Sequence, residues 1–241
     1  MCRGVPVASV GNLETYGLLP DIKDESMRRE ALDAFSRLYG PSGGKDTVAQ
    51  VLGQSGTDAL KGADILRTAP QKYSSSVEYA DNPIAQSLKN VAQVMSADLG
   101  TRVYYATHGS FDTHSNELMA HAKLWNDVGS AIADFTEDLR EQGLEDDTLI
   151  LVWSEFGRRI QDNGTGCDHG SGGTAFVIGG QVKGGLYGEY PSLKAEDQSE
   201  GDMRFNNDFR STYSTILDRW LGLDAASITH GKFEQFDFLG K

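Results

Sequence analysis

The sequence contains few cysteines, little basic charge and no long apolar run. Two cysteines, Cys2 and Cys167, are too few for a disulfide framework. Lys and Arg number 22 against 35 Asp and Glu, so the net charge is −13. This balance argues against a nucleic-acid-binding surface, which needs basic patches. No apolar stretch approaches the ~18 residues that cross a bilayer, and the first residues lack the charged and apolar regions of a signal peptide. We therefore expect neither a nucleic-acid partner nor a transmembrane segment.

The composition is otherwise that of a globular protein. The chain has 241 residues, of which 39% are apolar and 24% charged, enough for a sizeable core. Glycine is abundant at 28 residues, which indicates many tight loops. We predict a single domain over 1–241, with a variable lead-in over 1–81 and a motif-bearing core over 82–241.

Local patterns predict alternating helices and short strands. Expected helices lie over 25–39, around 47–63, from 83 to 100, over 117–142 and over 208–221. Expected strands cover 102–107, 148–153 and 174–178. The strand TLILVW is apolar throughout, as is typical of a strand buried on both faces. A strand, a long helix and a buried strand form a βαβ unit, so we predict an α/β fold with a mostly parallel sheet.

Polar side chains gather next to these predicted strands. The segments His108–His114 and Ser154–Arg158 follow two of them, and Asn163–Gly173 precedes the third. Ligands of open α/β sheets bind beyond the carboxyl ends of the strands. We therefore expect five side chains to converge: Asp112, His114, Glu155, Asp168 and His169. Such a set binds a divalent metal, zinc, manganese or similar, or acts as general acid and base. The alternative is that each is an ordinary loop or capping residue.

Other polar residues of these segments have weaker assignments. Ser154 is not in a G-x-S-x-G elbow, which argues against a hydrolase nucleophile at that position. We assign His108, Arg158 and Asn163 to substrate binding, with a salt bridge as the alternative for Arg158. Cys167 is interpreted as a small buried side chain, with a metal ligand as the alternative.

At these motifs the chain resembles domain-of-unknown-function family 1501, a group of mostly bacterial exported proteins. The motifs occur in the order SFDTH, SEFGR with a following Asn163, DHG, GGQVKGGLYGEYP and DFRSTYSTILDRWLG. The resemblance extends from about Asn82 to the C-terminus. It implies membership of the alkaline phosphatase and sulfatase superfamily, and therefore a three-layer α/β/α sandwich with a mostly parallel central sheet and a metal-dependent site.

The same resemblance implies roles for particular residues. Carried over by motif, Asp112, His114, Glu155, Asp168 and His169 are metal ligands. Phosphatases usually show an Asp-His pair where this chain has Glu155-Phe156. Family members usually carry a twin-arginine export signal and, in the same N-terminal part, the nucleophile. Nothing here matches that part, so we expect an N-terminally truncated domain.

Three functions follow as expectations. The first is a metal-dependent hydrolase of the alkaline phosphatase or sulfatase type, acting on a phosphate or sulfate ester of a small molecule or polysaccharide. The second is a non-catalytic exported protein that binds a carbohydrate or a surface and keeps the fold without a nucleophile. A plain metal-binding scaffold is a third. For each, the family resemblance implies a periplasmic or extracellular location.

Overall fold

The computed structural model describes most of the chain. It covers 24–39 and 69–240, together with Leu13, Ile22, Val48, Val51, 53–56, Gly62 and Leu66. Most of the predicted helix around 47–63 lies outside these residues. The chain divides into two compact units, Met1–His108 with Asp127–Asp138, and Gly109–Asn126 with Leu139–Lys241. The division into a lead-in and a motif-bearing core stays a prediction.

Three predicted helices are confirmed, and capping side chains begin two of them. The three are α1 (Glu25–Tyr39), α3 (Pro83–Ser96) and α4 (Glu117–Glu141). The Asp24 carboxylate accepts the Met27 amide at 2.9 Å, and the Asn82 side chain accepts the Ala85 amide at 2.9 Å. Both bonds satisfy donors of a first helical turn that have no partner within the helix. Pro83 occupies the first position of α3, where its missing N–H costs nothing.

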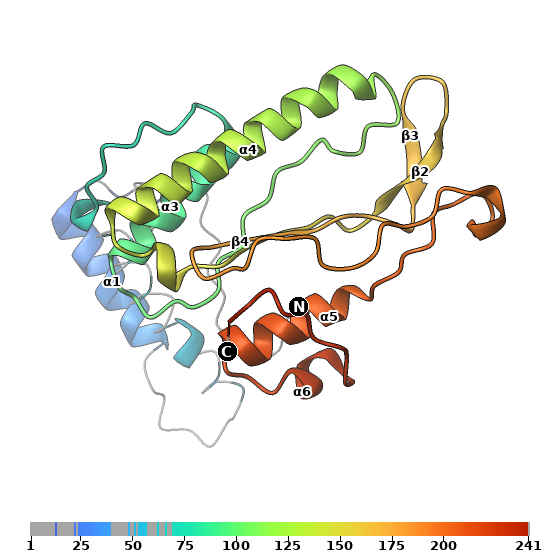
Figure 1. Ribbon diagram of the computed structural model, residues 1–241. Helices are drawn as coiled ribbons and strands as arrows, with labels where there is room; N and C mark the ends of the chain where they lie inside the picture. Colours follow the sequence, from blue (N-terminus) through green and yellow to red (C-terminus); the bar gives the residue numbers. More distant parts are fainter. Residues whose placement is uncertain are drawn as a thin grey trace. The chain divides into compact units, whose positions relative to one another are not determined.

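The first unit has a core in which α3 packs on the middle of α4 (Figure 1). Ile84 and Ala85 of α3 are buried against Ala131 of α4. Apolar side chains spaced along α4 are buried at Leu124, Val128, Phe135 and Leu139. At the first turn of the helix Leu118 is 85% exposed.

A buried carboxylate in the first unit is held by two tyrosines. Asp138 is fully buried, and its Oδ2 accepts hydrogen bonds from the hydroxyls of Tyr73 at 2.6 Å and Tyr79 at 2.8 Å. Burial raises the pKa of Tyr79, and the hydrogen bond to Asp138 raises it further. A buried carboxylate is costly without such donors, so these bonds join the extended segment at 73–79 to α4.

We expect Tyr79→Phe to lower the free energy of unfolding by about 1–3 kcal/mol, because it removes a donor from a buried charged acceptor. Urea unfolding followed by circular dichroism measures this change. Tyr190→Phe is the matched control, because Tyr190 is 79% exposed. Equal midpoints for the two variants would contradict the role given to the Tyr79 hydroxyl.

The second unit contains two small antiparallel sheets and a helical C-terminal part. Strand β1 (Ile150–Val152) pairs with β4 (Phe176–Ile178), and β2 (Gly157–Asp162) pairs with β3 (Cys167–Gly170). The C-terminal part comprises α5 (Phe209–Thr215), the π-helical turn η3 (Ile216–Trp220) and α6 (Ala225–Thr229). Two 3₁₀ turns, η1 (Glu145–Asp147) and η2 (Ala195–Asp197), lie in the connections.

The predicted three-layer sandwich with a mostly parallel sheet is wrong. In the described part of the chain each sheet has two strands, and both pairings are antiparallel. The predicted strands at 148–153 and 174–178 exist as β1 and β4, but they pair antiparallel, and the segment at 102–107 is not a strand. Strands β2 and β3 instead include residues of the two polar segments Ser154–Arg158 and Asn163–Gly173, where no strand was predicted. An apolar run indicates that a strand is buried but not which strand it pairs with, and that is where the prediction failed.

Among the helices that the structure describes, none combines the length and apolar character needed to cross a membrane.

Candidate metal centre

The second unit contains the β2–β3 hairpin (Figure 1), which includes Arg158, Cys167, Asp168 and His169 from the polar segments. The loop Asn163–Gly166 connects the strands, and Gly164 there has a φ of 101°. The Asn163 side-chain oxygen accepts the amides of Thr165 at 3.2 Å and Gly166 at 2.9 Å, which closes the turn. Asn-Gly is a strong hairpin signal in a sequence. This pair could therefore have predicted the hairpin that strand periodicity missed.

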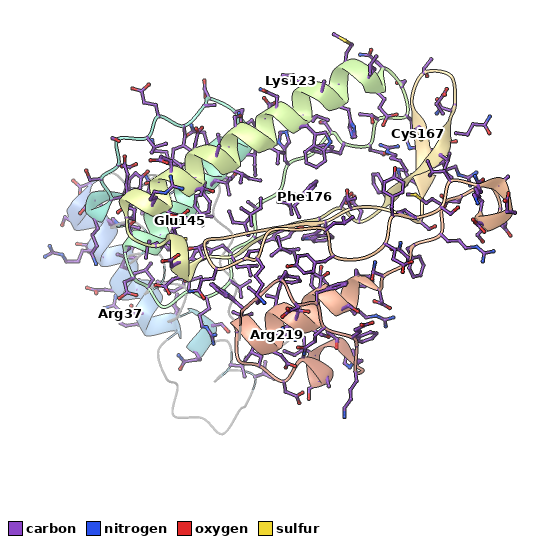
Figure 2. The ribbon with its side chains drawn as sticks, viewed as in Figure 1. Arg37, Lys123, Glu145, Cys167, Phe176 and Arg219 are labelled. Carbon is purple, nitrogen blue, oxygen red and sulfur yellow. The ribbon has the colours of Figure 1, made fainter. Side chains whose placement is uncertain are left out.

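The hairpin contains a bulge beside the candidate site. Arg158 lies opposite His169 and Asp162 opposite Cys167, so β2 has three intervening residues where β3 has only Asp168. Bulges re-aim side chains and leave backbone groups without ladder partners. The thiol of Cys167, labelled in Figure 2, donates to the carbonyl of Arg159 at 3.0 Å inside this bulge. Cys167 is buried, and burial raises the pKa of its thiol. These contacts agree with the structural interpretation of this cysteine.

The loop before α4 is docked on the hairpin. The Cys167 amide donates to the Thr113 carbonyl at 3.4 Å, and the Asn163 side-chain amide donates to the His114 carbonyl at 3.1 Å. Gly166 makes the close approach feasible, because a Cβ there would lie 2.4 Å from the His114 carbonyl carbon. This docking brings residues near 113 against residues near 167.

Arg158 also holds the loop before α4, through hydrogen bonds to Phe111 and Thr113. Its guanidinium donates to the carbonyls of Cys167 and Phe111 and, at 3.3 Å, to the Thr113 hydroxyl. Its side chain is 18% exposed, and its Nη2 lies 3.9 Å from Asp112 Oδ1. Three of the five guanidinium N–H groups thus have protein acceptors. In the structure Arg158 therefore links the hairpin to the loop before α4, and its role in substrate binding stays a prediction.

Docking brings three side chains with metal-binding atoms together. One ligand atom each from Asp112, His114 and His169 lies within 4.8 Å of the others. The Nε2 atoms of His114 and His169 lie 2.9 Å and 2.6 Å from the same oxygen, Asp112 Oδ1. The three side chains are 46–60% exposed. A solvent-facing set of two imidazoles and one carboxylate results.

His114 lies between two carboxylates. Its Nε2 faces Asp112, and its Nδ1 lies 3.1 Å from Asp168 Oδ1. Asn163 donates to the same Asp168 oxygen at 3.2 Å. Hydrogen bonds from Asn163 and His114 lower the pKa of Asp168, and the bond from His169 lowers the pKa of Asp112. Both carboxylates are therefore ionised at neutral pH.

His169 is positioned by ring stacking. Its ring lies on that of Phe156, with centroids 3.7 Å apart and planes inclined by 9°. The ring of His169 also stacks with that of His114 in the docked loop, with centroids 4.9 Å apart and planes inclined by 28°. The Cζ of Arg158 lies over the Phe156 ring, 5.1 Å from its centroid. Phe156 was not singled out from the sequence, because a single phenylalanine has no periodicity or motif that indicates this contact.

The structure assembles three of the five predicted ligands and places a fourth beside them. Asp168 contacts the Nδ1 of His114, the ring nitrogen that does not face Asp112, and is not one of the three. Glu155 is exposed next to Ser154, whose hydroxyl is 3.5 Å from its carboxylate, and it is outside the group. His108 belongs to the first unit, whereas the centre is built from the second. The ligand and substrate roles of Glu155 and His108 stay predictions.

The sequence matches the family described as Protein of unknown function (DUF1501) over residues 44–234. This match covers most of the chain, and the protein belongs to that family. No curated protein and no solved structure matches it.

Proposed function

We propose that Asp112, His114 and His169 bind one divalent transition-metal ion. The observation that carries this proposal is the convergence of two imidazole nitrogens and one carboxylate oxygen from segments more than fifty residues apart in sequence. Nitrogen and oxygen donors of this kind suit zinc, with manganese and iron as related choices. Three protein ligands are also typical of catalytic zinc sites, which keep a further position for water or substrate.

The contacts around His114 support the same proposal. Each of its ring nitrogens faces a carboxylate oxygen, and an ionised carboxylate only accepts hydrogen bonds. A metal ion beside Asp112 would bind the Nε2 lone pair of His114, while the Nδ1–H donates to Asp168. The Nδ1 bond to Asp168 is the carboxylate–histidine pairing that orients metal-bound imidazoles in many proteins.

We further propose that the protein is a metal-dependent hydrolase acting on a phosphate or sulfate ester. A bound divalent ion would polarise the ester and lower the pKa of a water molecule. Asp168 and Asn163 orient His114, and Arg158 holds the loop that carries Asp112. The family resemblance is the basis for the ester class and for a proposed periplasmic or extracellular location.

The test combines metal binding with turnover. Protein purified without chelator is analysed for zinc, manganese and iron by elemental mass spectrometry, and zinc binding to the metal-free protein is measured by calorimetry. We expect about one equivalent, as for a single three-ligand site. The loaded protein is then assayed with aryl phosphate and aryl sulfate esters.

The outcomes separate the two parts of the proposal. Metal binding with ester hydrolysis that is lost in Asp112→Asn supports both parts. Metal binding without turnover of either ester would assign the chain to the non-catalytic alternative. A protein that binds none of the three metals would contradict the whole proposal.

A further inference from the structure

The two histidines of the centre are oriented by different means. The Nδ1 of His114 is hydrogen-bonded to Asp168 Oδ1, and Asn163 donates to the same oxygen. His169 uses its Nε2 toward Asp112, and its ring face lies on Phe156. A single hydrogen bond through Nε2 leaves an imidazole free to rotate about that contact. A flat neighbour against the ring face removes this rotation.

We propose that Phe156 is a positioning residue that fixes the ring plane of His169 and so directs its Nε2 at the metal position. This inference rests on the proposed metal site and adds a residue that supports it from outside the ligand set. The stack is close and nearly parallel, with centroids 3.7 Å apart and planes inclined by 9°. Phe156 directly precedes β2, and His169 lies on the paired strand β3, so the hairpin holds both rings at a set distance.

The geometry of the stack also favours a charged partner. Two neutral aromatic rings avoid a face-to-face arrangement, because both faces are electron-rich. An imidazole that coordinates a cation is attracted to the phenylalanine face instead. A parallel ring pair is therefore the arrangement expected of a phenylalanine that supports a cation-binding histidine.

The backbone around Phe156 keeps the ring in place. Arg158, two residues on, has its Cζ over the same ring at 5.1 Å and donates to the carbonyls of Phe111 and Cys167. The ring that stacks on His169 is thus also in contact with a guanidinium that is itself anchored. Phe156 is only partly buried, so its ring is not required to fill a core.

The test replaces the ring and measures zinc binding by calorimetry. We expect Phe156→Leu to weaken zinc affinity by about 10–100-fold, the usual effect of losing a group that supports a metal ligand. Phe156→Tyr keeps the ring face and is expected to retain wild-type affinity. Phe205→Leu is the matched control, because Phe205 is 65% exposed on another segment. Phe156→Met replaces the leucine variant if circular dichroism shows that the latter is unfolded.

A second readout does not need metal. A ring above an imidazole shifts the resonances of its carbon-bound protons upfield, so in metal-free protein the His169 signals are expected upfield. They are assigned by their loss in His169→Ala. We expect Phe156→Leu to move them toward the positions of unstacked histidines and Phe156→Tyr to leave them in place.

Unchanged zinc affinity in Phe156→Leu, or unmoved His169 signals, would overturn the inference. If wild-type protein binds none of zinc, manganese and iron, the proposed function fails. The proton signals then decide by themselves whether Phe156 holds the ring of His169. The two failures are therefore distinguishable.

Discussion

The double variant His114→Ala/His169→Ala is expected to lose its bound metal. Two of three ligand atoms disappear, and Asp112 alone cannot hold a transition-metal ion at micromolar concentration. The wild-type protein should retain about one equivalent of zinc after gel filtration, and the double variant should retain almost none. Elemental mass spectrometry on the two proteins, prepared in parallel without chelator, measures the difference.

The fold should survive this substitution. Both imidazoles are about half exposed, at 47% and 46%, so their removal is expected to change the free energy of unfolding by less than about 1 kcal/mol. His230→Asn is the matched control, because His230 is exposed at the C-cap of α6 and has a φ of 57°, which asparagine accepts. Equal metal content in the double variant and the control would show that the metal binds elsewhere or not at all.

Gly166→Ala is expected to disturb the proposed metal centre without replacing any ligand side chain. Its Cβ would lie 2.4 Å from the His114 carbonyl carbon and 2.5 Å from the Thr113 oxygen, closer than Cβ atoms are found to approach backbone atoms. The loop that carries Asp112 and His114 must then move away from β3. We expect zinc affinity to fall by about 10–100-fold and the free energy of unfolding to fall by about 1–3 kcal/mol.

Calorimetry with zinc and urea unfolding measure the two effects. Gly184→Ala is the control, because a Cβ at Gly184 meets nothing within 4 Å. A Gly166→Ala protein with wild-type zinc affinity would show that docking of the 113–114 backbone on Gly166 is unnecessary for the site.

Part of the fold could be predicted because its determinants are local. The starts of α1 and α3 follow from Asp24 and Asn82, which accept amides three residues further on. The length of α4 follows from a long apolar period and from Gly143 beyond its end, which has a φ of 69°. Such interactions lie within a few residues of one another, so the sequence contains the complete pattern.

The prediction that ligands converge was made from a parallel sheet that the described residues do not form. Asp112 was expected beyond the carboxyl end of one strand, and His169 in the segment that precedes another. In the structure they meet because the loop at 111–114 docks on an antiparallel hairpin. The chemistry of the residues and their order in the motifs were sufficient to select three members of the group. The same reasoning also selected Glu155, which the structure leaves outside it.

The sequence by itself determined the starts of α1 and α3, the acidic composition, and the residue types of the proposed metal centre. Only the tertiary structure decided which strands pair, which carboxylate faces both imidazoles, and that Phe156 lies on His169. The physical reason is range. Caps and helical periods act over three or four residues, whereas the contacts of Asp112 with His169 and of Asn163 with His114 join residues 57 and 49 positions apart. Such contacts form only once the strands have paired.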